Sequence, residues 1–143
     1  MSISRRAVTL LVALLAVLGL ASAPASAHGK PTPPVRPLAQ AHAHNDYEHP
    51  RPLLDALAAG FTSVESDIYL VDGQLLVGHD PQDLTAERTL EALYLEPLRA
   101  RVLATHGRVY QRPADFQLLV DIKTEANSTY AALEQRLRNP RYS

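Results

Sequence analysis

Cysteine is absent from all 143 residues of the sequence. No disulfide can therefore staple the fold, and no thiolate can serve as a nucleophile or a metal ligand. A lipid anchor attached through cysteine is excluded for the same reason. An excess of one charge is lacking too, because 14 lysine and arginine residues face 15 acidic residues and the net charge is −1. The chain thus has no broad basic field of the kind that attracts nucleic acid.

An apolar run long enough to cross a bilayer is lacking as well. The run at residues 7–20 falls short of the roughly 18–20 residues of a membrane-spanning helix, but fits the roughly 7–15 residues of a signal-peptide core. Arg5 and Arg6 precede it, and Ala25-Ser26-Ala27 follows as a small-residue cleavage site. We therefore predict that residues 1–27 are a signal peptide of a secreted, extracellular protein of bacterial source, whose mature chain has no transmembrane segment.

The rest of the sequence predicts one small α/β domain. Removing 27 of the 143 residues leaves 116, which is enough for a single hydrophobic core. Residues 28–38 are expected to form a proline-rich linker, and residues 39–143 the domain. Hydrophobic periodicity predicts strands from about residue 38 to 44 and over 61–71, 74–78 and 116–122, with helices over 50–59, 89–105 and 130–137.

The order of these elements favours a parallel sheet, because strands alternate with helices. Asp72-Gly73 predicts a tight hairpin turn between the second and third strands. The second helix is expected to be interrupted at Pro97. The strand over 116–122 is almost wholly apolar, so we expect it to be buried on both faces.

Polar side chains gather where the predicted strands end. The carboxyl ends of parallel strands lie at one edge of a sheet, which is where α/β proteins build their sites. We therefore expect four polar segments to lie close together. These segments are His42-Ala43-His44-Asn45-Asp46, Glu65-Ser66-Asp67, His79-Asp80 and Asp121-Ile122-Lys123.

Acidic residues in two of these segments need partners. Glu65 and Asp67 share one face of a strand, because side chains alternate with period two. Two carboxylates so close repel unless a cation or a base lies between them, which favours a site for a hard, oxygen-bound cation. Asp121 follows an apolar run, and Lys123 on the same face can neutralise it. A plain structural ion pair explains this second pattern equally well.

Together the motifs resemble the superfamily of glycerophosphodiester phosphodiesterases and phosphatidylinositol-specific phospholipases C. Within this superfamily, the sequence most specifically resembles the group of altered inheritance of mitochondria protein six and its bacterial exported relatives. The resemblance covers about residues 40–137. The segments that carry it are His44-Asn45-Asp46-Tyr47, Pro52-Leu53-Leu54-Asp55-Ala56-Leu57, Thr62-Ser63-Val64-Glu65-Ser66-Asp67, Leu75-Leu76-Val77-Gly78-His79-Asp80, and Arg88-Thr89-Leu90 with Leu93-Tyr94-Leu95.

This resemblance implies a TIM (β/α)8 barrel and a phosphoric diester hydrolase that depends on a divalent cation, Mg²⁺ or Ca²⁺. The substrate would be a phosphodiester such as a lipid or a lipid headgroup. Charge grows on the phosphate oxygens during cleavage, and a carboxylate-bound cation, a lysine and two histidines suit that chemistry. The site residues that the resemblance implies are the catalytic pair His44 and His79, the metal ligands Glu65, Asp67 and Asp121, and the substrate-binding residues Lys123 and Asn45.

Two features depart from the wider superfamily. Typical glycerophosphodiesterases have His-Arg-Gly where this chain has His44-Asn45-Asp46, so an arginine that helps to bind phosphate is missing. The 116 residues after the signal are also fewer than the about 250 that a complete barrel takes. The predicted fold is therefore the N-terminal part of a barrel, truncated after about three βα units.

Two other interpretations are open at this point. His42 and His44 after the first strand also resemble the opening motif of amidohydrolase-type enzymes, in which both histidines bind zinc. Alternatively, the chain is a non-catalytic exported barrel fragment that holds a ligand without turning it over.

Overall fold

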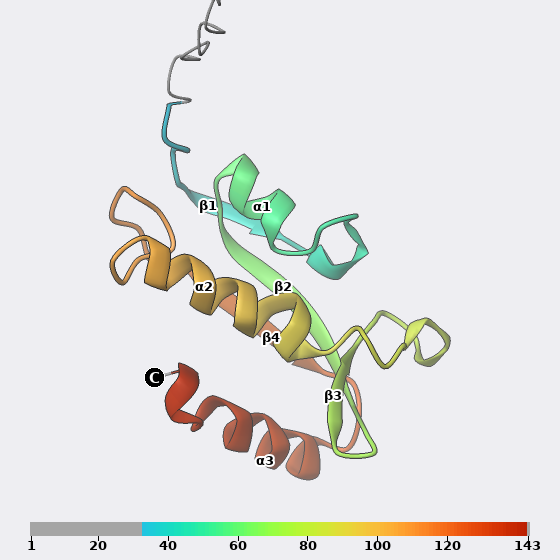
Figure 1. The fold of residues 1–143 in the computed structure, drawn as a ribbon. Coiled ribbons are helices and arrows are strands. Elements are labelled where there is room, and N and C mark those ends of the chain that lie inside the picture. The colour runs from blue at the N-terminus through green and yellow to red at the C-terminus, as the bar shows by residue number, and fades with distance from the viewer. Residues whose placement is uncertain (1–32, 143) are drawn as a thin grey trace, which may run out of the picture. The chain divides into compact units, whose positions relative to one another are not determined.

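A computed structural model describes residues 33–142 of the chain (Figure 1). The predicted signal peptide and most of the predicted linker lie outside the described residues. No helix within residues 33–142 is long and apolar enough to cross a membrane. The main elements are β1 (Leu38–Ala43), α1 (Leu54–Ala59), β2 (Phe61–Val71), β3 (Gln74–Val77), α2 (Glu96–Ala104), β4 (Gln117–Ile122) and α3 (Ala126–Leu137). Short turns η1 (Asp46–Glu48), η2 (Pro81–Asp83) and η4 (Pro140–Tyr142) and a π-helical turn η3 (Glu91–Leu95) join them.

Strand β2 is the centre of a four-stranded sheet. It pairs in parallel with β1 and β4 and antiparallel with β3. Asp72 and Gly73 both adopt positive φ between β2 and β3, as a two-residue type I′ hairpin turn requires. The predicted mixed α/β architecture with a parallel sheet is thus confirmed, together with the predicted order of elements.

The helices differ from the prediction at their ends. Helix α1 begins at Leu54 rather than near residue 50, because Leu53 has a φ of 62° and cannot belong to a right-handed helix. Helix α3 begins before the predicted residue 130, because the Glu125 carboxylate accepts hydrogen bonds from the backbone of Asn127 and Ser128. Near Pro97, where an interruption was expected, the π-helical turn η3 gives way to α2. The proline lies in the first turn of α2.

Strand β4 is less buried than predicted. None of its six residues is fully buried: Gln117 and Leu119 are exposed, Leu119 to 39%, and the other four are half-buried. Among the strands that the structure describes, β4 pairs with β2 alone, so its second edge carries no neighbour there. An apolar run is compatible with burial on both faces, but it does not report which neighbours cover the strand.

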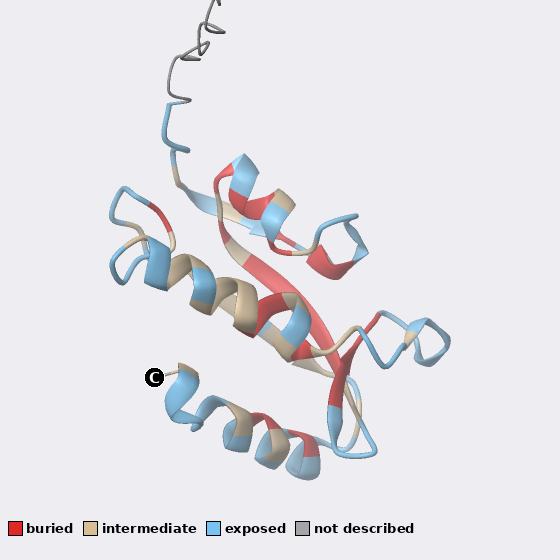
Figure 2. Ribbon diagram, viewed as in Figure 1, coloured by how far each residue is buried: buried red, intermediate tan, exposed pale blue. Residues whose placement is uncertain are grey.

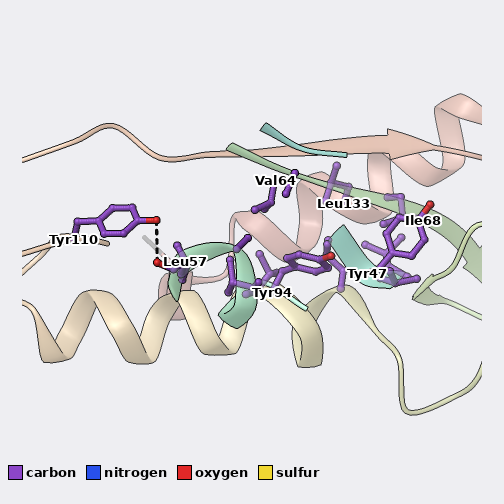
Figure 3. Close-up of a cluster of buried hydrophobic side chains, with 14 residues drawn as sticks. Tyr47, Leu57, Val64, Ile68, Tyr94, Tyr110 and Leu133 are labelled. Atoms are coloured by element: carbon purple, nitrogen blue, oxygen red, sulfur yellow. Dashed lines mark hydrogen bonds between the residues drawn. The ribbon is translucent and has the colours of Figure 1, made fainter. Parts of the chain in front are cut away.

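The hydrophobic core lies against β2, which is buried along most of its length (Figure 2). In Figure 3, the side chains of the core gather between the sheet and helix α2. Helix α3 adds Leu133 to the same core. The buried members are Ala43, Tyr47, Leu53, Ala56, Leu57, Val64, Ile68, Leu75, Val77, Leu90, Tyr94, Leu95, Tyr110 and Leu133.

A buried carboxylate anchors the loop that follows β1. Asp46 has no exposed surface, and its Oδ2 accepts hydrogen bonds from the backbone N–H of Leu53, at 2.5 Å, and from the hydroxyl of Tyr94, at 3.0 Å. Tyr94 lies in η3, so the bond ties the loop after β1 to the helical segment that precedes α2. Burial and the charge of Asp46 raise the pKa of Tyr94 above its ordinary value.

Gly60 makes the sharp return from α1 into β2. Its φ is +93°, and its carbonyl accepts the N–H of Leu38 at 2.8 Å. A Cβ at this position would lie 2.5 Å from the carbonyl oxygen of Arg36. The turn therefore needs glycine for its backbone conformation and also for the close approach of the chain that enters β1.

We predict that Gly60→Ala lowers the free energy of unfolding by more than the about 1–2 kcal/mol that a left-handed conformation costs an alanine. The additional loss comes from the Arg36 carbonyl, which must move. Gly73→Ala is the matched control, because Gly73 also has positive φ but no atom lies within 4 Å of its Cβ position. Urea denaturation followed by circular dichroism measures both variants, and equal losses would contradict the prediction.

We also predict that Tyr94→Phe lowers the free energy of unfolding at neutral pH by about 1–3 kcal/mol, because buried Asp46 loses a donor. The raised pKa of Tyr94 adds a pH dependence. The folded protein keeps this phenol neutral while the unfolded chain ionises it, so this stability is complete below about pH 10 and is lost as the pH rises above it.

Urea denaturation at pH 7 and above pH 10 tests this point. Tyr94→Phe should lose less stability at alkaline pH than the wild type does. Tyr130→Phe is the control, because Tyr130 is exposed on α3 and its removal should leave the alkaline loss unchanged. The same alkaline loss in Tyr94→Phe and in the wild type would show that another group causes it.

Candidate functional site

The pairing of β2 with its neighbours brings the predicted acidic residues together. Glu65 and Asp67 lie on β2, and Asp121 on β4 stands directly beside Asp67 in the parallel register. One carboxylate oxygen from each of the three lies within 4.8 Å of the others. The three side chains that the resemblance names as metal ligands are therefore neighbours, in the middle of β2 and near the carboxyl end of β4.

Two of the three carboxylates in this cluster are buried, so their charge and their oxygen atoms need partners. Asp67 is 1% exposed and Glu65 is 9% exposed, while the side chain of Asp121 is 46% exposed. The Oδ1 atom of Asp67 is buried and has no hydrogen-bond partner. A buried carboxylate oxygen without a donor is unfavourable. A cation ligated by this carboxylate would remove that deficit.

Lys123 supplies part of the compensating charge. Its Nζ lies 2.7 Å from Asp121 Oδ2 and 3.0 Å from Asp67 Oδ2. Hydrogen bonds to Asp121 and Asp67 raise the pKa of Lys123 above its ordinary value, so the ammonium is charged at neutral pH. Three carboxylates and one ammonium leave two negative charges, which suits a divalent cation held by oxygen ligands.

His44 lies directly after β1, beside the first of these acids. Its Nε2 is 3.3 Å from Glu65 Oε2, and its side chain is 74% exposed. The backbone N–H of Asn45 donates to the same Oε2 at 3.1 Å. Asn45 takes a left-handed conformation with a φ of 49°, which asparagine tolerates better than most residues. The Asn45 side chain donates to Glu48 at 3.4 Å.

His79 lies beside the second acid of β2. Its Nδ1 is 3.6 Å from Asp67 Oδ2, and about half of its side chain is exposed. The hairpin places it there, because Ile68 pairs with Val77 and the N–H of Gly78 donates to the carbonyl of Asp67 at 3.4 Å. The two predicted histidines therefore contact two different carboxylates of the same strand.

Tyr47 is a site residue that the sequence reasoning did not include. It is buried, and its hydroxyl donates to Asp67 Oδ2 at 2.8 Å and lies 3.1 Å from His79 Nδ1. Burial, the hydrogen bond to Asp67 and nearby acidic charges raise the pKa of Tyr47 above its ordinary value. Its place directly after His44-Asn45-Asp46 was the one signal in the sequence, and a single aromatic beside a motif is weak.

A polar pocket of about 440 Å³ opens next to His79. Arg88 reaches into its wall and donates to the backbone carbonyl of Tyr47 at 2.5 Å. A guanidinium thus stands close to the site even though this chain lacks the arginine of the His-Arg-Gly motif. The pocket is lined by Tyr47, Glu48, His49, Pro50, Gly78, His79, Asp83 and Arg88.

His42 contacts a serine instead of one of the acids. Its Nδ1 lies 2.8 Å from the hydroxyl of Ser63, its cross-strand neighbour on β2. The metal-compatible group found among residues 33–142 consists of Glu65, Asp67 and Asp121 and includes no histidine. This arrangement favours a hard cation over the zinc site that His42 and His44 would form in an amidohydrolase.

Comparison with curated proteins places the chain among fungal relatives. It is 46% identical over 63 residues to an altered inheritance of mitochondria protein 6 homolog of Arthroderma benhamiae, which covers 40% of this chain and 20% of that protein. It is 38% identical over 107 residues to the protein 6 of Lachancea thermotolerans, covering 64% and 25% of the two chains. It is 42% identical over 127 residues to that of Eremothecium gossypii, covering 79% and 33%.

The chain therefore spans between a fifth and a third of the length of these relatives. All three are yeast or other fungal proteins that are named for the inheritance of mitochondria. The prediction of a secreted bacterial protein is wrong on this evidence. A basic and apolar N-terminus followed by small residues is a compositional pattern, and it does not identify the source of a chain.

A family model described as the AIM6-like phosphodiesterase domain matches residues 32–142. This match includes every element from β1 to α3 and all of the candidate site residues. No solved structure matches the chain at a significant level. The family model and the curated relatives agree with the resemblance inferred from the motifs, and the chain belongs to the family of AIM6-like phosphodiesterase domains.

Proposed function

We propose that this domain belongs to a metal-dependent phosphoric diester hydrolase in which His44 and His79 transfer protons. The observation that carries the proposal is the register of β2, which sets three carboxylates within 4.8 Å and a histidine beside each of two of them. A phosphodiesterase-like family supports the reaction class. Because the chain spans only part of its relatives, the activity of the whole protein is part of the proposal.

Glu65, Asp67 and Asp121 would hold Mg²⁺ or Ca²⁺. Their oxygen atoms match the preference of hard cations, and the buried Oδ1 of Asp67, which makes no hydrogen bond, can serve as one of the ligand atoms. Bound there, a divalent cation would supply electrostatic stabilisation of the charge that develops on the phosphate oxygens. Lys123 adds a second positive group on the same side, and Asn45 lies at the rim beside His44.

The two histidines divide the proton transfers. His44 is exposed and accepts the proton of the attacking hydroxyl or water. His79 lines the polar pocket, so it faces the space for a leaving group and donates a proton to the departing alkoxide. Both acidic and basic side chains line this pocket, which favours a polar alcohol such as a lipid headgroup over an acyl chain.

The proposal includes the fold of the intact domain. Parallel strands β1, β2 and β4 with intervening helices, and a site at the level where β1 and β4 end, are typical of the N-terminal part of a (β/α)8 barrel. A truncated barrel is therefore our proposed description of this α/β unit. Secretion is no part of the proposal, since the relatives contradict it.

We predict metal-dependent hydrolysis of bis(p-nitrophenyl) phosphate, stimulated by Mg²⁺ or Ca²⁺ and abolished by EDTA. His44→Ala and His79→Ala should each lower kcat by about 10²–10⁴-fold, the usual contribution of general acid–base catalysis. The release of p-nitrophenol measures the rate. The assay should use this chain and also the longest reading frame that contains it.

His42→Ala is the matched control for this assay, because His42 is a neighbouring histidine that contacts Ser63 rather than the acids. Its turnover should stay close to that of the wild type. Loss of turnover in His42→Ala together with activation by zinc would favour the amidohydrolase interpretation. Absence of turnover by a folded long form would favour a barrel that binds without catalysis.

We further predict that the carboxylate cluster binds Mg²⁺ or Ca²⁺ without substrate, because the cation relieves repulsion among buried acids. Isothermal titration calorimetry measures the affinity. Asp67→Asn and Asp121→Asn should weaken binding by about tenfold or more, since each removes a charged ligand. Glu134→Gln on α3 removes an exposed acid of a surface ion pair and is the control. Equal affinity in all variants would place the cation elsewhere.

A further inference from the structure

The hydroxyl of Tyr47 lies between two groups of the proposed site. Its oxygen is 2.8 Å from Asp67 Oδ2 and 3.1 Å from His79 Nδ1. Asp67 Oδ2 also lies 3.6 Å from the same ring nitrogen. Nδ1 of His79 therefore faces one phenol oxygen and one carboxylate oxygen, whereas Nε2 is on the opposite edge of a ring that is about half exposed.

A count of protons decides the direction of these bonds. A phenol carries one proton, and an ionised carboxylate can only accept. The proton of Tyr47 is therefore donated to Asp67, as the 2.8 Å contact indicates. The phenol oxygen can then act toward His79 only as an acceptor, so the hydrogen of that second bond must come from Nδ1. The Asp67 oxygen at 3.6 Å is too far away for a hydrogen bond, but its negative charge also favours a proton on Nδ1.

We propose that Tyr47 is a positioning residue that keeps a hydrogen of His79 on Nδ1, so that the neutral ring is the Nδ1–H tautomer and Nε2 is the atom that carries the additional proton of the imidazolium and gives it to the leaving group. The catalytic meaning of this assignment rests on the proposed function, but the tautomer itself does not. A fixed Nδ1–H bond also fixes the plane of the ring, as in other sites where the second nitrogen of a histidine sets its role.

The surroundings of Tyr47 keep its hydroxyl in place. The side chain belongs to the buried core, and its backbone carbonyl accepts a hydrogen bond from Arg88 at 2.5 Å. His79 is restrained independently, because the Tyr69 hydroxyl donates to its backbone carbonyl at 2.8 Å. The hydrogen bond of Tyr69 thus reaches the backbone of His79, whereas that of Tyr47 reaches the ring nitrogen Nδ1.

Nitrogen NMR tests the tautomer on the full chain. Long-range ¹H–¹⁵N correlation spectra of protein labelled with ¹⁵N-histidine, recorded without metal above the pH at which the imidazole ionises, distinguish a protonated ring nitrogen from an unprotonated one. The signals of His79 are assigned by their absence in His79→Gln. We expect a protonated Nδ1 and an unprotonated Nε2 in the wild type. A protonated Nε2 would overturn the proposal, whatever the variants do.

Tyr47→Phe removes the hydroxyl alone and should let His79 populate the Nε2–H tautomer. Tyr69→Phe is the matched control, and it should leave the tautomer as in the wild type because it breaks only the bond to the His79 carbonyl. Amide spectra report whether each variant is folded. An unchanged tautomer in folded Tyr47→Phe would show that Asp67 suffices and would contradict the role of Tyr47.

Kinetics separate this inference from the proposed function. With bis(p-nitrophenyl) phosphate and Mg²⁺, Tyr47→Phe should lower kcat by about tenfold and leave KM nearly unchanged. This loss is smaller than the loss of about 10²–10⁴-fold that is expected when a general acid is removed. A rise in KM at constant kcat would assign Tyr47 to substrate binding and overturn positioning. If the wild type turns over no phosphodiester, the proposed function fails, and the NMR result still decides the tautomer.

Discussion

The pairing of β2 with three other strands is the constraint on which the rest of the structure depends. β1, β3 and β4 all form hydrogen bonds with β2, so one strand sets the register of the whole sheet. Its alternate residues serve opposite purposes, since Val64 and Ile68 enter the core while Glu65 and Asp67 face the site. A slip of one residue would exchange these two sets and remove both the core and the cluster.

The loop after β1 depends on the same arrangement. Asp46 is fixed by Leu53 and Tyr94, and this places His44 and Asn45 against Glu65 and Tyr47 against Asp67. Packing and chemistry are therefore coupled at a few buried polar atoms. A substitution that weakens the hydrogen bonds of Asp46 would therefore move the site residues, even though it changes none of the three acids of the cluster.

Much of this was predictable from local patterns. Period-two alternation identified Glu65 and Asp67 as neighbours, and turn chemistry at Asp72-Gly73 identified the hairpin that carries His79. The contact between Tyr47 and His79 was not predictable, because 32 residues separate them and only the fold closes that distance. The exposure of β4 was also not predictable from its apolar pattern, because it depends on which other strands and helices lie beside it. The source was predicted wrongly, because the prediction rested on a short N-terminal signal pattern and on a resemblance that includes bacterial exported relatives.

Two buried aspartates have similar burial but different partners, and the partners indicate which of them is structural and which belongs to the site. Asp46 and Asp67 are equally hidden, and each keeps one oxygen without a hydrogen-bond donor. The donors to Asp46 are a backbone N–H and a core phenol, which hold the loop after β1 in place. Asp67 instead contacts an ammonium, an imidazole and a phenol that reaches the imidazole. Of these two acids, Asp67 is the one that contacts an ammonium and an imidazole, so burial at Asp46 serves the fold, while burial at Asp67 gathers the charged groups that the proposed reaction requires.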